Sequence, residues 1–231
     1  MNARSPAVSR GFTLLEVLIA MAIAAVIALV SYQALSTASA GAEATRAVFQ
    51  EVNRLDRSWQ ILGGDLQQAL KPEPGPLGLR FEFAGSSLRA TGANAQQGVL
   101  MLTRRGWVNP LERLRSDMQK VIYRVEEGTL WRDYLPERNL NYDDIDFVYE
   151  AYNQRLLDGV RDIQLRFLSA AVVQSRGQAA LEGYRYSDDW EPEWPSPDQQ
   201  EATRTTLPLA VEITIEMEAG YSITRLFEIG R

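Results

Sequence analysis

The sequence predicts an α+β fold in which one long N-terminal helix packs on a mostly antiparallel β-sheet head. Two observations support this prediction. Residues 17–35 contain no charged side chain, and a helix of that length spans roughly 28 Å, close to the hydrocarbon thickness of a bilayer. After a proline cluster at residues 72–76, the apolar residues change from helical spacing to the alternation typical of half-buried strands. One long helix followed by strands belongs to the α+β class.

The composition excludes several classes of function. The 231 residues are 45% hydrophobic, which is enough for one domain with its own core. The net charge is −6, and loss of residues 1–11 would remove two arginines and make it −8. Nucleic-acid binding needs clustered cations, so we expect none. Because cysteine and histidine are absent, disulfides, thiolate zinc sites and a Ser-His-Asp triad are excluded.

A short polar leader with Arg4 and Arg10 precedes the apolar run, and one carboxylate, Glu16, stands at its start. Acidic side chains in membrane-spanning segments are costly and usually functional. The leader cations predict that the N-terminus stays cytoplasmic. A cut before Phe12 would create an α-ammonium at residue 12, four residues before Glu16. The Glu16 carboxylate could neutralise this α-ammonium or that of a neighbouring subunit. The alternative interpretation of the leader and apolar run is a cleavable secretory signal that ends at residues 38–40. Such a signal gives no reason for the carboxylate of Glu16.

Residues 11–16, Gly-Phe-Thr-Leu-Leu-Glu, resemble the prepilin peptidase site of type IV pilins and pseudopilins. The resemblance implies that residues 1–11 are a leader and that the peptidase cuts between Gly11 and Phe12. It also implies that Phe12 is then N-methylated. In that family Glu16 supplies the charge that assembly needs, and the resemblance favours pairing with the terminus of an adjacent subunit.

Residues 36–70 are predicted to continue the membrane helix of residues 12–35 as an amphipathic half outside the membrane. An apolar stripe recurs at spacings of three and four through Val48, Val52, Leu55, Trp59, Leu62 and Leu66. We expect this stripe to pack on the protein's own sheet, and a coiled coil with another chain is the alternative. Gly63 and Gly64 should loosen the helix near its end, and the prolines after Lys71 should stop it near Leu70.

The head, residues 71–231, is predicted to consist of strands. Alternating apolar residues predict strands over residues 79–83, 99–103, 121–125, 130–132, 160–167, 209–217 and 221–229. Glu127-Gly128 and Ala219-Gly220 are the predicted hairpin turns. Residues 171–207 show no apolar period, so we expect a long loop.

Two features of the head have functional interpretations. Trp190 and Trp194 lie in the long loop, either as exposed anchors for a partner or packed back onto the sheet. Residues 143–150 hold carboxylates at Asp143, Asp144, Asp146 and Glu150, which are hard ligands suited to calcium. Their spacing is not that of an EF-hand, so we prefer a solvated acidic loop and predict no metal or other cofactor. The absence of phosphate-loop, nucleophile-elbow and zinc motifs predicts that the protein is not an enzyme.

Two further segments narrow the resemblance to the J family of type II secretion minor pseudopilins: residues 156–160, Leu-Leu-Asp-Gly-Val, and residues 207–213, Leu-Pro-Leu-Ala-Val-Glu-Ile. This resemblance implies a pilin-like structural protein, anchored in the bacterial inner membrane with a periplasmic head. It implies assembly with the I, K and H subunits and the major pseudopilin at the tip of a filament that supports export of folded proteins.

The same resemblance implies encounters with the prepilin peptidase, with membrane lipid, and with exoproteins and the secretin. Two alternatives stay open at this point. One is a minor pilin of a type IV pilus or competence system, and the other is a signal-anchored periplasmic enzyme.

Overall fold

The computed structural model describes residues 12–72, 81–87, 99–106, 117–136, 150–176, 190–197 and 205–230. The chain divides into two compact units, Met1–Asn53 and Arg54–Arg231. The predicted leader, including Gly11, and the aspartates of residues 143–146 lie outside the described residues.

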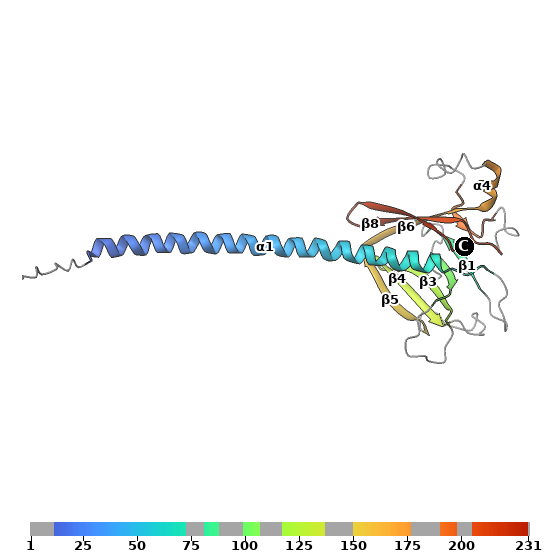
Figure 1. The fold of residues 1–231 in the computed structure, drawn as a ribbon, viewed down its shortest axis with the longest axis horizontal. Helices are drawn as coiled ribbons and strands as arrows, with labels where there is room; N and C mark the ends of the chain where they lie inside the picture. Colours follow the sequence, from blue (N-terminus) through green and yellow to red (C-terminus); the bar gives the residue numbers. More distant parts are fainter. Residues whose placement is uncertain are drawn as a thin grey trace, which may run out of the picture. The chain divides into compact units, whose positions relative to one another are not determined.

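Helix α1, Leu14–Gln67, is the longest element of the chain (Figure 1). All side chains from Phe12 to Asn53 are exposed. Among the residues that the structure describes, α1 is the one helix whose length and composition would allow it to cross a membrane. The helix ends three residues before the predicted Leu70. The chain leaves it to pair with a strand, because Ala69 bridges Arg104 and the Leu70 N–H donates to the Thr103 carbonyl oxygen at 2.8 Å.

The predicted apolar stripe of α1 is divided between two environments. Trp59, Leu62 and Leu66 are buried in the core of the second unit, as expected for packing on the protein's own sheet. Val48 and Val52, by contrast, are 61% and 47% exposed. These two residues lie in the first unit, and for them packing on the sheet stays a prediction.

The larger sheet has six strands in the order β5-β4-β3-β2-β1-β7, and all neighbouring pairs are antiparallel. The predicted turn Glu127-Gly128 joins β3 to β4. Its φ values of 49° and 71° are those that a two-residue type I′ hairpin requires. The strands are β1 (Phe83–Ser86), β2 (Leu100–Arg104), β3 (Gln119–Glu126), β4 (Thr129–Pro136), β5 (Tyr152–Asp158) and β7 (Glu193–Trp194).

The smaller sheet contains β6 (Val160–Leu168), β8 (Ala210–Met217) and β9 (Ser222–Glu228) in the antiparallel order β6-β8-β9. The β8–β9 pair confirms the predicted final hairpin. Gly159, with φ 70°, lies where the chain passes from β5 in one sheet to β6 in the other. A short helix, α4 (Ala170–Arg176), follows β6 in the segment that was predicted to be a loop.

The last turns of α1 share one core with both sheets, as Figure 1 shows for β3 to β5 on one side and β6 and β8 on the other. The Trp59 ring centroid lies 5.8 Å from that of Phe227 in β9. Gly230, next to the end of the chain, donates its N–H to the Leu66 carbonyl oxygen at 3.4 Å. A Cβ on residue 230 would lie 2.4 Å from the Gln67 carbonyl oxygen, so this close approach requires glycine.

Candidate assembly sites at the helix start and in the head

Glu16 and Thr13 form a reciprocal capping box at the start of α1. The Glu16 N–H lies 3.2 Å from Thr13 Oγ1, and the Thr13 N–H lies 3.5 Å from Glu16 Oε2. Such a box satisfies two of the backbone donors that a helix start leaves unpaired. The Thr-x-x-Glu spacing is the signal in the sequence that indicates this local role. Glu16 therefore has a structural task in addition to any charge pairing between subunits.

The surface around Glu16 is apolar and open. Phe12 is 83% exposed and Leu14 81% exposed, and Glu16 itself is exposed. A carboxylate on a surface that faces lipid or other apolar helices needs a positive partner, because leaving the charge unpaired there is costly. Phe12 would supply that partner as a new N-terminus, four residues away, once a cut is made before it.

Asp65 is the centre of a buried cluster in the head that no local motif of the sequence predicts. Its side chain is fully buried, and it accepts hydrogen bonds at 2.6 Å from the Tyr123 hydroxyl and at 2.6 Å from Arg132 Nε. Arg132 Nη2 donates a further bond at 3.1 Å, and Arg104 Nη1 also donates to the carboxylate. The partners come from β2, β3 and β4, so Asp65 attaches the last turns of α1 to three strands.

Burial and charge fix the protonation states in this cluster. Burial raises the pKa of Tyr123 well above its ordinary value, and the negative charge of Asp65 raises it further, so the hydroxyl stays a donor. Burial alone would lower the pKa of Arg132, but hydrogen bonding and attraction to Asp65 outweigh it and raise that pKa. A carboxylate so fully hydrogen-bonded serves as a structural anchor and has no free lone pair for acid–base chemistry.

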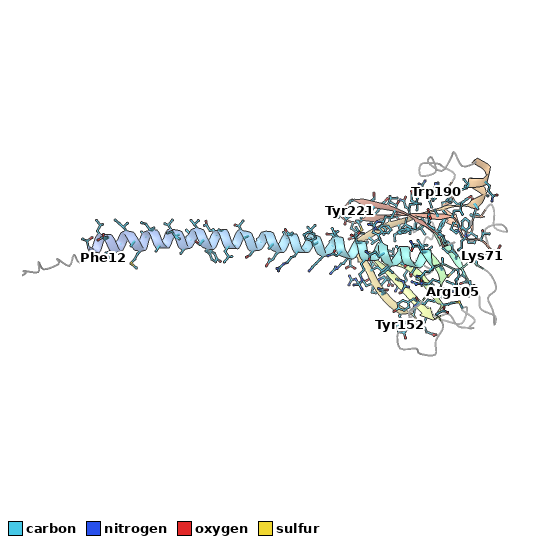
Figure 2. The ribbon with its side chains drawn as sticks, in the orientation of Figure 1. Phe12, Lys71, Arg105, Tyr152, Trp190 and Tyr221 are labelled. Atoms are coloured by element: carbon cyan, nitrogen blue, oxygen red, sulfur yellow. The ribbon has the colours of Figure 1, made fainter. Side chains whose placement is uncertain are left out.

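Trp190 and Trp194, the sequence-predicted partner anchors, are buried at 6% and 2% exposure. The Trp194 indole N–H donates to the Thr206 carbonyl oxygen at 3.2 Å, and its ring lies 6.2 Å from that of Phe167. Trp190 clusters with Leu168, and Figure 2 shows it on the side of the head that carries α4. The premise of exposed anchors is wrong for the chain alone, whereas a role of the surrounding loop in partner binding stays a prediction.

We expect Trp194→Phe to lower the free energy of unfolding by about 1–2 kcal/mol, because the variant loses the bond to Thr206 and some core volume. Urea unfolding of the full chain, followed by circular dichroism, measures this change. Trp131→Phe, at a half-buried position, is the matched control and should cost less. A Trp194→Phe variant of unchanged stability that binds partners poorly would contradict the packing role.

The residues that the structure describes contain no cluster of three or more potential metal ligands. Glu150 is described and exposed. The prediction that residues 143–150 bind no calcium therefore stays a prediction.

The features at the two ends of α1 define the class of this protein. The apolar helix begins at a Phe-Thr-Leu-Leu-Glu start and ends in a β-sheet head, which is the plan of pilin-like proteins carrying an N-terminal methylation motif. A model of the prokaryotic N-terminal methylation motif matches residues 7–32. A model of type II secretion system protein J matches residues 33–229, and the chain belongs to this family.

Individual relatives agree with this assignment. The chain is 29% identical to type II secretion system protein J of Klebsiella pneumoniae over 222 residues, covering 95% of this chain and 94% of that one. It is 26% identical to type II secretion system protein J of Vibrio cholerae over 226 residues, with 95% and 87% covered. A chain in the crystal structure of the GspK-GspI-GspJ complex from enterotoxigenic Escherichia coli shares the fold, with a TM-score of 0.51 and 22% identity. The match covers 78% of this chain and 98% of that one.

Proposed function

We propose that this protein is a structural subunit of a type II secretion pseudopilus, a minor pseudopilin that assembles with the I, K and H subunits at the filament tip. Residues 12–35 would anchor it in the inner membrane, with the N-terminus in the cytoplasm and the head in the periplasm. Membership of the protein J family over residues 33–229 supports this role. The fold is shared with a chain of the solved GspK-GspI-GspJ complex.

The observation that carries the proposal is the position of Glu16 on an exposed apolar helix. After the leader is cut, each subunit carries an α-ammonium at Phe12 and a carboxylate at Glu16. When helices from different subunits pack side by side in lipid, pairing these charges avoids a cost of roughly several kcal/mol for each uncompensated ion. The charge pair therefore selects the axial register in which the helices assemble.

The capping box gives this hypothesis a sharp test. Gln at the third helical position can still complete a capping box, so Glu16→Gln keeps the local helix start and removes only the charge. We expect Glu16→Gln and Glu16→Ala to be processed normally at Phe12 and to lose assembly and secretion to the same extent. Mass spectrometry of the mature N-terminus, cross-linking to other pseudopilins and the amount of exported protein measure these effects.

If the Glu16→Gln variant supports secretion and the Glu16→Ala variant does not, the role of Glu16 is capping. This result would exclude the charge pair between subunits. Normal secretion by both variants would show that secretion needs neither the charge of Glu16 nor its capping contact.

The proposal extends to the partners that the family resemblance implies: the major pseudopilin, the prepilin peptidase, membrane lipid, exported proteins and the secretin. The first alternative, a minor pilin of a type IV pilus or competence system, would share the start of the chain and differ in partners. The match of the protein J model to the head favours the secretion system. Co-purification with the other secretion pseudopilins, rather than with pilus subunits, decides between the two.

A further inference from the structure

A cleft of about 390 Å³ lies between α1 and β5 in the head. Arg54, Arg57, Ser58 and Ile61 line it from the helix, and Gln154, Arg155, Leu156 and Asp158 line it from the strand. The two walls meet at Ser58, whose buried hydroxyl lies 3.0 Å from the Leu156 carbonyl oxygen in the strand and 2.8 Å from the Arg54 carbonyl oxygen in its own helix.

The charges of the cleft are unbalanced. Three arginines and one carboxylate line the cleft, and two of the arginines share that carboxylate: Arg155 Nε lies 2.6 Å from Asp158 Oδ1, and Arg54 Nη1 lies 3.7 Å from Asp158 Oδ2. Arg57 is exposed and has no acidic partner among the residues that the structure describes. The cleft therefore carries two excess positive charges on a chain whose net charge is −6.

We infer that this cleft, here named the arginine cleft, binds a segment of a neighbouring pseudopilin that presents two carboxylates. The inference rests on the proposed function and specifies the chemistry of the partner surface. Two excess guanidinium groups match two carboxylates, which a helix presents on one face at positions i and i+4. Arginine binds carboxylates through a planar fork of donors, which gives such a contact direction as well as charge.

The neighbouring edge strand supports a protein occupant. β5 is the outer strand of the six-stranded sheet, and no other described strand pairs with its far side. Tyr152, which is labelled in Figure 2, lies at the start of β5 and is 60% exposed. An open strand edge offers unpaired backbone groups, and exposed tyrosines are favoured at protein interfaces. Anionic lipid surfaces, in contrast, attract flat clusters of four to eight cations, whereas this site is a walled cleft with three cations and one anion.

Charge reversal at Arg57 tests the inference, because Arg57 lines the cleft without holding an ion pair of the fold. The full-length tagged chain is placed in nanodiscs of phosphatidylcholine and mixed with increasing concentrations of the I and K pseudopilins. The fraction of these pseudopilins that the tagged chain captures is then measured. We expect Arg57→Glu to weaken capture by at least about tenfold, and capture by the wild-type chain to weaken as salt is raised. Arg105→Glu makes the same charge change at an exposed residue outside the cleft and should leave capture unchanged.

Arg57→Lys keeps the charge but loses the planar fork of donors, so its capture should be weaker than that of the wild-type chain and stronger than that of Arg57→Glu. Its amine also permits carbodiimide coupling: the amine and a touching carboxylate form an amide, with the carbodiimide taking up the water that is lost. Mass spectrometry of the coupled product should then identify an Asp or Glu of the partner.

Equal capture by Arg57→Glu and Arg105→Glu would overturn the cleft inference and leave the proposed function standing. A wild-type chain that captures neither subunit would overturn both. An effect of Arg57→Glu that appears only when the nanodiscs contain phosphatidylglycerol would assign the cleft to lipid headgroups, and coupling to a second copy of this chain would assign it to self-association. Either result would overturn the inference.

Discussion

Asp65→Ala is expected to unfold the head at a urea concentration well below that needed for the wild-type chain. The substitution leaves Arg104, Arg132 and the Tyr123 hydroxyl without their common acceptor inside the core. Removing one partner of a buried ion pair costs roughly 3–5 kcal/mol, because the remaining charge is uncompensated. Whole domains are stable by only about 5–15 kcal/mol, so this loss is a large share of the total.

Asp56→Ala is the matched control for this change, since Asp56 is also an aspartate of α1 paired with an arginine. Its partner Arg225 lies 2.9 Å away, but both side chains are about half exposed, and exposed pairs contribute roughly 0–1 kcal/mol. Urea unfolding of the full-length chain in detergent, followed by tryptophan fluorescence, compares the two variants. Equal losses would show that Asp65 is not the anchor described above.

Gly11→Val is expected to block removal of the leader. The resemblance of residues 11–16 to the prepilin peptidase site places the cut directly after Gly11, where a branched side chain crowds the peptidase. The unprocessed chain would keep residues 1–11 and would have no α-ammonium at Phe12, so it could not form the charge pair with Glu16. We therefore expect secretion to fall to the level of a strain that lacks the protein.

The measurement is the mass of the chain recovered from membranes. Gly41→Val is the control, because a Cβ at this exposed helix position meets no atom within 4 Å, and the variant should be processed fully. A Gly11→Val chain that begins at Phe12 would remove the assignment of the cleavage site.

The sequence predicts those parts of the fold that local chemistry determines. The turn Glu127-Gly128 forms as expected because both residues adopt positive φ, which the flanking apolar alternation and the glycine already indicated. The final hairpin was predictable for the same reason, since one face of β8 is buried along its whole length. The start of α1 was predictable because Glu16 is the last charged residue before the apolar run of residues 17–35.

The elements that were missed lack a local pattern. β5 begins with the polar residues Tyr152, Asn153 and Gln154, because it is an edge strand whose first half is exposed. β7 has two residues and exists only because β1 pairs with it. The apolar stripe keeps the same spacing from Val48 to Leu66, so the spacing does not tell that its residues are buried from Trp59 onward.

The candidate sites also differ in whether a local sequence pattern indicates them. The roles of Gly11, Phe12 and Glu16 come from a contiguous motif and stay predictions for experiment, whereas the capping box with Thr13 was visible in the spacing and was overlooked. The Asp65 cluster was hidden because its members are far apart in the sequence. A usable signal existed in strand parity, since Arg132 shares the inward face of β4 with Leu130 and lies opposite Tyr123.

The contact between the last residues of the chain and the end of α1 has a consequence for how the protein is made. Asp56 and Arg225, which form an ion pair, are 169 positions apart, and Gly230 bonds to Leu66. Contacts of such long sequence separation close slowly. During synthesis Trp59 leaves the ribosome long before Phe227 of β9, whose ring lies 5.8 Å from its own. A chain that stops before β9 would therefore leave this side of the Trp59 ring uncovered.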